Sequence, residues 1–121
     1  MTGYVTNIER ETLKNEDYRR VLFTGPNTQL VLMTLRPGED IGLETHYEHD
    51  QFIRVEAGEA IALLDGVEYP LNDGSAVVIP AGVEHNVRNV ADEPLRLYTL
   101  YSPPEHPVGT VQHTKLEAAA H

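Results

Sequence analysis

Short runs of strand-forming residues, separated by turn residues, occupy most of this 121-residue chain. The runs are rich in apolar, β-branched or aromatic side chains, and Gly, Pro, Asn or Asp lies at most of the boundaries between them. They cover residues 18–24, 29–35, 51–56, 59–64, 67–71, 76–79, 86–90 and 95–101. Strands of this length at this spacing predict an all-β fold, either a sandwich or a barrel of the jelly-roll kind.

Helical patterns are short and lie near the two ends of the chain. Residues 7–14 and 114–120 each suffice for one or two helical turns. We expect a single domain over residues 1–121, with its core at about 30–101, an N-terminal arm at 1–17 and a C-terminal tail at 102–121. The tail begins with two prolines, which interrupt a strand ladder.

The lack of cysteine excludes several kinds of site. A chain without Cys forms no disulfide, thiolate nucleophile, zinc finger or iron–sulfur cluster. The longest uninterrupted apolar run has five residues, at 60–64, whereas a membrane span needs about 20. The first residues lack the basic and apolar regions of a secretory signal, so we expect a cytoplasmic protein.

The distribution of charge limits the expected partners. The chain has 19 acidic and 9 basic residues and a formal charge of −10. Eleven of the acidic residues lie in the segment 37–87, where Arg54 is the only basic residue. We expect most of these acids to form a solvated surface and a subset to be available to a cation. The charge argues against nucleic acid or an anionic membrane as partner and leaves a small molecule as the expected ligand.

Four polar residues of the central segment form a candidate metal site. Glu44 and His46 are two residues apart, so on an extended strand both side chains point to one face. His85 follows a Pro-Ala-Gly turn at the start of a strand, and Gln51 starts another strand. A carboxylate, two imidazoles and an amide oxygen suit a divalent transition metal. Taken singly, each of these residues is better explained as a polar surface or loop residue, but their joint spacing favours the metal site.

The remaining histidines have simpler interpretations. His49 lies three residues after His46 in a polar link, and we expect it to be a loop or pocket-rim residue. His106, His113 and His121 fall in the tail, where we expect solvated imidazoles.

Two motifs in the chain resemble those of the cupin family. The chain reads Gly38-x5-Glu44-x-His46-x4-Gln51-x6-Gly58 and then Gly74-x5-Pro80-x-Gly82-x2-His85-x3-Asn89. The second motif agrees with the family pattern at every specified position. The first keeps the family spacing, but Glu44 stands where the family has a histidine and Gln51 stands where it has a glutamate. The chain is thus similar to a small single-domain cupin over about residues 30–101.

The resemblance implies a jelly-roll barrel with a metal site. By position the ligands are Glu44, His46, Gln51 and His85. Two oxygen and two nitrogen donors favour Mn or Fe(II), with Ni, Co or Zn as further possibilities. Small cupins often pair their barrels, so the resemblance also implies a homodimer.

The expected pocket is largely apolar. Alternation along the strand 95–101 turns Thr99 and Tyr101 inward, and Met33, Tyr47 and His49 are further candidates for its lining. No cluster of Lys or Arg converges on the candidate site, which argues against a phosphorylated sugar as substrate.

The sequence therefore leans to a metal-dependent enzyme that acts on a small non-phosphorylated molecule, with a dioxygenase-like oxidoreductase favoured. A non-catalytic module that binds a metal or metabolite is the first alternative, and a metal-dependent isomerase or lyase is the second.

Overall fold

The computed structural model describes residues 2–119, which form nine strands and two short helices. The strands are β1 (Arg19–Thr24), β2 (Gln29–Leu35), β3 (Asp50–Ala57), β4 (Ala60–Leu64), β5 (Val67–Leu71), β6 (Ala76–Ile79), β7 (His85–Asn89), β8 (Leu95–Ser102) and β9 (Val111–Gln112). The helices are α1 (Ile8–Lys14) and α2 (Lys115–Ala119).

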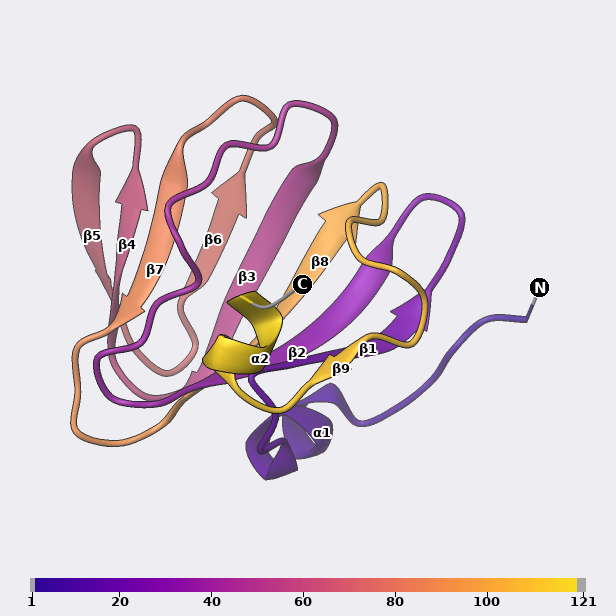
Figure 1. The fold of residues 1–121 in the computed structure, drawn as a ribbon, viewed down its shortest axis with the longest axis horizontal. Helices are drawn as coiled ribbons and strands as arrows, with labels where there is room; N and C mark the ends of the chain where they lie inside the picture. The colour runs from indigo at the N-terminus through magenta and orange to yellow at the C-terminus, as the bar shows by residue number, and fades with distance from the viewer. Residues whose placement is uncertain (1, 120–121) are drawn as a thin grey trace.

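The strands form two antiparallel sheets that enclose the core (Figure 1). The larger sheet has the order β6-β3-β8-β2-β1-β9, and the smaller has the order β5-β4-β7. Apolar side chains of both sheets pack between them in one buried cluster, as Ile53, Leu97, Ala62 and Val87 illustrate. The arrangement is a jelly-roll barrel, so the predicted all-β fold is confirmed.

Strand β8 shows how the sequence pattern sets the inner face. Leu95, Leu97, Thr99 and Tyr101 are buried, whereas the residues between them are partly exposed. Strand β8 pairs along its length with β2 on one side and β3 on the other, so it is an interior strand of the larger sheet. This central position places Thr99 and Tyr101 on the interior side of the barrel.

The link between β2 and β3 differs from the expectation. We expected Glu44 and His46 on an extended strand, but the structure gives them an irregular segment that forms isolated bridges. In Figure 1 this link follows β7, and the amide of Ile41 donates to the carbonyl of Val87 at 3.0 Å. The link makes single contacts with β7 instead of a ladder, which is why a strand period does not describe it.

The last residue of the second motif has a structural role. Asn89 is buried, and its amide nitrogen donates to the carbonyls of Leu35, at 3.0 Å, and Glu93, at 2.9 Å. Its Oδ1 accepts from the amide of Ala91 at 2.9 Å. The side chain thereby ties the turn after β7 to the end of β2.

The segments expected as an N-terminal arm and a C-terminal tail both contain regular secondary structure. Helix α1 begins one residue later than predicted, because Asn7 is its N-cap and its side chain accepts from the amide of Arg10 at 2.9 Å. Helix α2 occupies most of the second predicted helix, whose last residue, at 120, lies outside the described part. Strand β9 was not predicted, because two residues carry no readable period; it pairs with β1 at the sheet edge.

Within residues 2–119 no helix has the length and apolar character that crossing a bilayer requires.

Gly58, the last residue of the first motif, allows two chain segments to meet. It has a φ of +115°, and a Cβ there would lie 3.1 Å from the Cα of Leu95 and 3.1 Å from the carbonyl oxygen of Pro94. Both neighbours are backbone atoms, which yield little. Glycine is therefore needed for its conformation and for its small size.

We predict that Gly58→Ala lowers the free energy of unfolding by about 2–5 kcal/mol, because backbone strain adds to overpacking. Gly66→Ala is the matched control, since Gly66 also has a positive φ, +82°, but its Cβ would meet nothing within 4 Å. It should cost about 1–2 kcal/mol. Urea denaturation of both variants measures the difference, and equal losses would contradict the close-approach argument.

Candidate metal centre

Backbone hydrogen bonds hold the two motifs against each other. The amide of Glu44 donates to the carbonyl of His85 at 2.9 Å, and the amide of His85 donates back to the carbonyl of Glu44 at 2.8 Å. Two residues further on, the carbonyl of His46 accepts from the amide of Gly82 at 2.7 Å. These bonds fix the irregular link beside the mouth of β7 and bring its side chains to that of His85.

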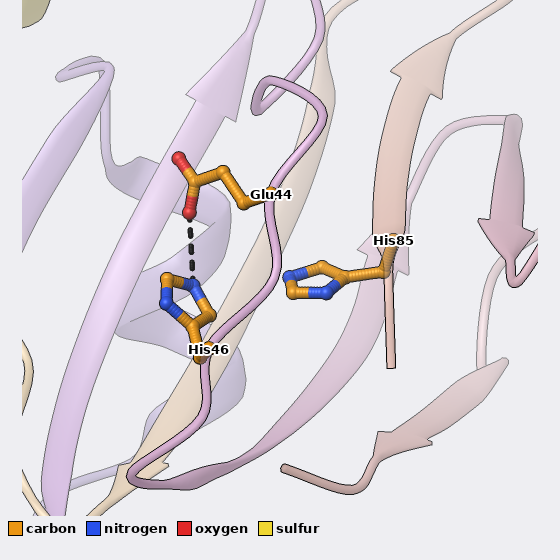
Figure 2. A group of neighbouring side chains, drawn as sticks. All are labelled: Glu44, His46 and His85. Carbon is orange, nitrogen blue, oxygen red and sulfur yellow. Dashed lines mark ion pairs between the residues drawn. The ribbon is translucent and has the colours of Figure 1, made fainter. Parts of the chain in front are cut away.

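Three of the four residues singled out in the sequence meet there. Figure 2 shows Glu44 and His46 on the link, with the carboxylate next to the imidazole, and His85 approaching from β7. Oε2 of Glu44 lies 2.8 Å from Nε2 of His46, and the ring centres of His46 and His85 are 5.2 Å apart. One donor atom from each residue lies within 4.8 Å of the others. We call Glu44, His46 and His85 the inner cluster.

The hydrogen bonds of the inner cluster leave two imidazole nitrogens without a partner. Nδ1 of His85 lies 2.9 Å from the carbonyl oxygen of Val83, which can only accept, so this nitrogen carries the proton. Nε2 of His85 is therefore a lone-pair donor, and it is buried without a hydrogen-bond partner. Nε2 of His46 likewise forms no hydrogen bond in spite of its short distance to Glu44. Fixing one imidazole nitrogen through a backbone carbonyl is how proteins orient metal-binding histidines.

Gln51, the fourth residue, approaches the barrel interior from β3. Its side chain is buried, and Nε2 donates to Oγ1 of Thr99 at 3.0 Å. Its amide oxygen Oε1 is buried without a partner. Gln51 pairs across the sheet with Tyr101, whose ring lies 6.2 Å from that of His46.

Other pocket candidates divide by burial. Met33, Thr99 and Tyr101 are buried, and burial raises the pKa of Tyr101. Tyr47 is 79% exposed, so the expected polar handle points away from the interior.

His49 is more deeply placed than a rim residue. Its side chain is 7% exposed, and its Nε2 lies 2.9 Å from Oε2 of Glu105. Burial lowers the pKa of His49, although the Glu105 carboxylate acts in the opposite direction. Together with His46 these residues form a second group whose donor atoms lie within 4.8 Å of one another.

Sequence reasoning missed Glu105. It lies 59 positions after His46, beyond Pro103 and Pro104, and no spacing relative to the motifs marks it. The path of the tail, whose backbone is held by Gln29, brings it near the two histidines.

His106 corrects the expectation of solvated tail histidines. Its ring lies edge-on to Tyr101 at 5.1 Å, and burial, reinforced by the positive charge of Arg19, lowers the pKa of His106 to about 4. His113 is the solvated case, beside Asp17 at the surface. His121 lies outside the described residues.

Comparison with known proteins identifies the family. The family model for the cupin domain matches residues 31–101. The chain belongs to the cupin family. A crystal structure of BH2720 from Bacillus halodurans is 45% identical, with a TM-score of 0.97 over 99% of this chain and 96% of that one.

Two curated relatives extend this comparison. The uncharacterized protein YrkC of Bacillus subtilis is 47% identical over 97% of this chain, and the chain spans 66% of the length of YrkC. The polyketide synthase CurC of Streptomyces cyaneus is 34% identical over 74% of this chain and 57% of its own length.

The low pKa of His106 makes its contribution to stability depend on pH. As the pH falls from about 6.5 to about 4, the unfolded chain binds a proton at this residue that the folded chain does not. We predict that this contribution destabilises the folded state over that range and that His106→Gln removes it. Urea denaturation at pH 7 and pH 5 measures the effect as a smaller loss of stability in the variant.

His113→Gln is the matched control for this measurement. Asp17 raises the pKa of His113, so its contribution has the opposite sign. If His106→Gln loses as much stability on acidification as the unchanged protein, the assignment to His106 is wrong.

Proposed function

We propose that this cupin is a metal-dependent enzyme that acts on a small, non-phosphorylated organic molecule, with a dioxygenase-like oxidation as the favoured reaction. Glu44, His46, Gln51 and His85 are the proposed ligands of one divalent transition metal. When bound, the ion supplies a Lewis acid that polarises an oxygen-bearing substrate and a position where O₂ can react.

The single observation that carries the proposal is a set of buried donor atoms without partners. Nε2 of His46, Nε2 of His85 and Oε1 of Gln51 all lack hydrogen bonds, although burying an unpaired polar atom is costly. Oε2 of Glu44 lies 2.8 Å from the first of these atoms without a hydrogen bond. Neighbouring ligands of one ion at about 2.1 Å lie about 3 Å apart, so the spacing suits shared coordination.

The donor set favours Mn or Fe(II) over softer metals. A carboxylate and an amide oxygen beside two imidazoles make this site harder than one with three imidazoles. Gln51 is neutral, but its amide nitrogen donates to Thr99. This hydrogen bond leaves Oε1 as the atom of the side chain that can bind the ion. Glu44 supplies the negative charge that offsets the ion.

The surroundings favour a substrate without a phosphate. The carboxylates of Glu44 and Glu105 lie beside His46 and repel an anion. Arg19 is near enough to affect the pKa of His106, but its guanidinium donates to Gln112 at 2.7 Å.

A substrate has access to the cluster from outside. The side chain of Glu44 is 44% exposed and that of His46 is 15% exposed, whereas His85 is buried. In this proposal Tyr101 and Thr99 form the interior wall, and the open side at Glu44 admits the substrate.

The test is O₂ consumption by protein loaded with Fe(II) or Mn(II), measured with a panel of small enols, diketones and phenols and a parallel panel of sugar phosphates. We predict turnover in the first panel alone and a loss of at least about 100-fold in His85→Ala, which removes a ligand. His113→Ala is the control, because it removes an exposed imidazole far along the chain from both motifs.

Two outcomes would contradict this function. Metal-loaded protein that turns over no substrate, with or without O₂, supports the non-catalytic metal- or metabolite-binding module. Turnover that does not require O₂ supports the isomerase or lyase.

A further inference from the structure

A second set of donor atoms lies on the other side of His46. Oε2 of Glu105 is 2.9 Å from Nε2 of His49 and 3.7 Å from Nδ1 of His46. The rings of His46 and His49 are 4.4 Å apart. We call His46, His49 and Glu105 the outer cluster. It shares His46 with the inner cluster but uses a different nitrogen of that ring.

A simple ion pair does not account for this cluster. Nε2 of His49 is buried and forms no hydrogen bond, although a carboxylate oxygen lies within 2.9 Å. The oxygen therefore lies away from the direction in which an N–H group would point. Two donor atoms at this separation that do not bind each other can both direct a lone pair at one ion placed between them. Ligands of one ion at about 2.1 Å are separated by about 3–4 Å, which covers both distances from Glu105.

The fold holds Glu105 in place instead of leaving it on a free tail. Oε1 of the fully buried Gln29 accepts from the amides of Glu105, at 3.2 Å, and His106, at 3.0 Å. Nε2 of Gln29 donates back to the carbonyl of His106 at 2.8 Å and to Oγ1 of Thr24 at 2.9 Å. A buried amide that binds both polar groups of a segment fixes that segment's position.

We propose that His49, Glu105 and Nδ1 of His46 form a second binding position for a divalent transition cation. Of its three residues only His46 is a specified position of either motif, and the proposal does not depend on the reaction proposed above. A neutral imidazole offers one lone pair, so His46 serves one ion at a time. The inner and outer positions therefore compete for His46, and a chain that has lost the inner cluster still binds a cation through the outer one.

The test is equilibrium dialysis of tag-free protein against Co²⁺, with bound metal measured by mass spectrometry and the visible Co²⁺ spectrum recorded. We expect His85→Ala to bind one Co²⁺ with a spectrum that differs from that of the unchanged protein. Adding Glu105→Gln or His49→Gln to this variant should weaken the remaining binding by at least about tenfold. Glu105→Gln alone should keep the binding at the inner cluster.

Controls separate the outer position from folding and from chance surface binding. Glu44→Ala provides a second background, because Glu44 is exposed and its loss leaves the core intact. His113→Gln added to His85→Ala removes an exposed histidine–carboxylate pair and should leave Co²⁺ binding unchanged. Circular dichroism of each variant confirms that it is folded.

Each outcome decides between the two positions. Equal Co²⁺ binding by His85→Ala and His85→Ala/Glu105→Gln overturns the outer position. If His85→Ala alone abolishes binding, the inner site stands and the outer position falls. If binding ignores His85 but requires Glu105, the outer position stands and the proposed inner ligand set fails.

Discussion

The reciprocal backbone pairing of Glu44 with His85 is the constraint on which the site depends. Two hydrogen bonds, at 2.9 and 2.8 Å, join a loop residue of the first motif to the first residue of β7. The amide of Gly82 then holds the carbonyl of His46. The side chains are brought together by backbone bonds, so their positions do not depend on attraction between the side chains themselves. Such preorganisation leaves buried lone pairs available without reorganisation of the fold.

The second motif could be read from the sequence because each of its residues has a local task. Pro80 and Gly82 form the turn, His85 starts the strand, and Asn89 closes the next turn through its buried side chain. Glu44 and His46 do lie next to each other, but they are not on the extended strand that was expected. The two residues lie on an irregular link with single bridges, where the two-residue strand period does not apply.

The outer cluster could not be predicted, for a physical reason. His49 was visible in the sequence, but its burial follows from the packing of the link against Tyr101, whose ring lies 5.5 Å away. Glu105 reaches His49 because Gln29, on a strand 76 positions earlier, binds its backbone. Neither contact leaves a periodic pattern. The same path explains why His106, expected in solvent, has a lowered pKa.

Acidic side chains lie in both candidate clusters. Glu44 lies at the inner cluster, and Glu105, which is outside that segment, lies at the outer one. Gln51 stands where the family has a glutamate and so carries no charge into the barrel interior, while the tail brings the Glu105 carboxylate beside His46 and His49. Carboxylates of Glu44 and Glu105 therefore lie beside the two ring nitrogens of His46, which is the basis for proposing a cation and a substrate without phosphate.

X-ray absorption spectroscopy of the protein loaded with one equivalent of Mn²⁺ tests the central claim most directly. The account predicts two imidazole nitrogens and at least two oxygens at about 2.0–2.3 Å in Glu105→Gln, which lacks the outer position, and one imidazole fewer when His85→Ala is added to it. An ion surrounded by oxygen alone, or a spectrum that is the same in Glu105→Gln with and without His85→Ala, would contradict a metal centre at Glu44, His46, Gln51 and His85.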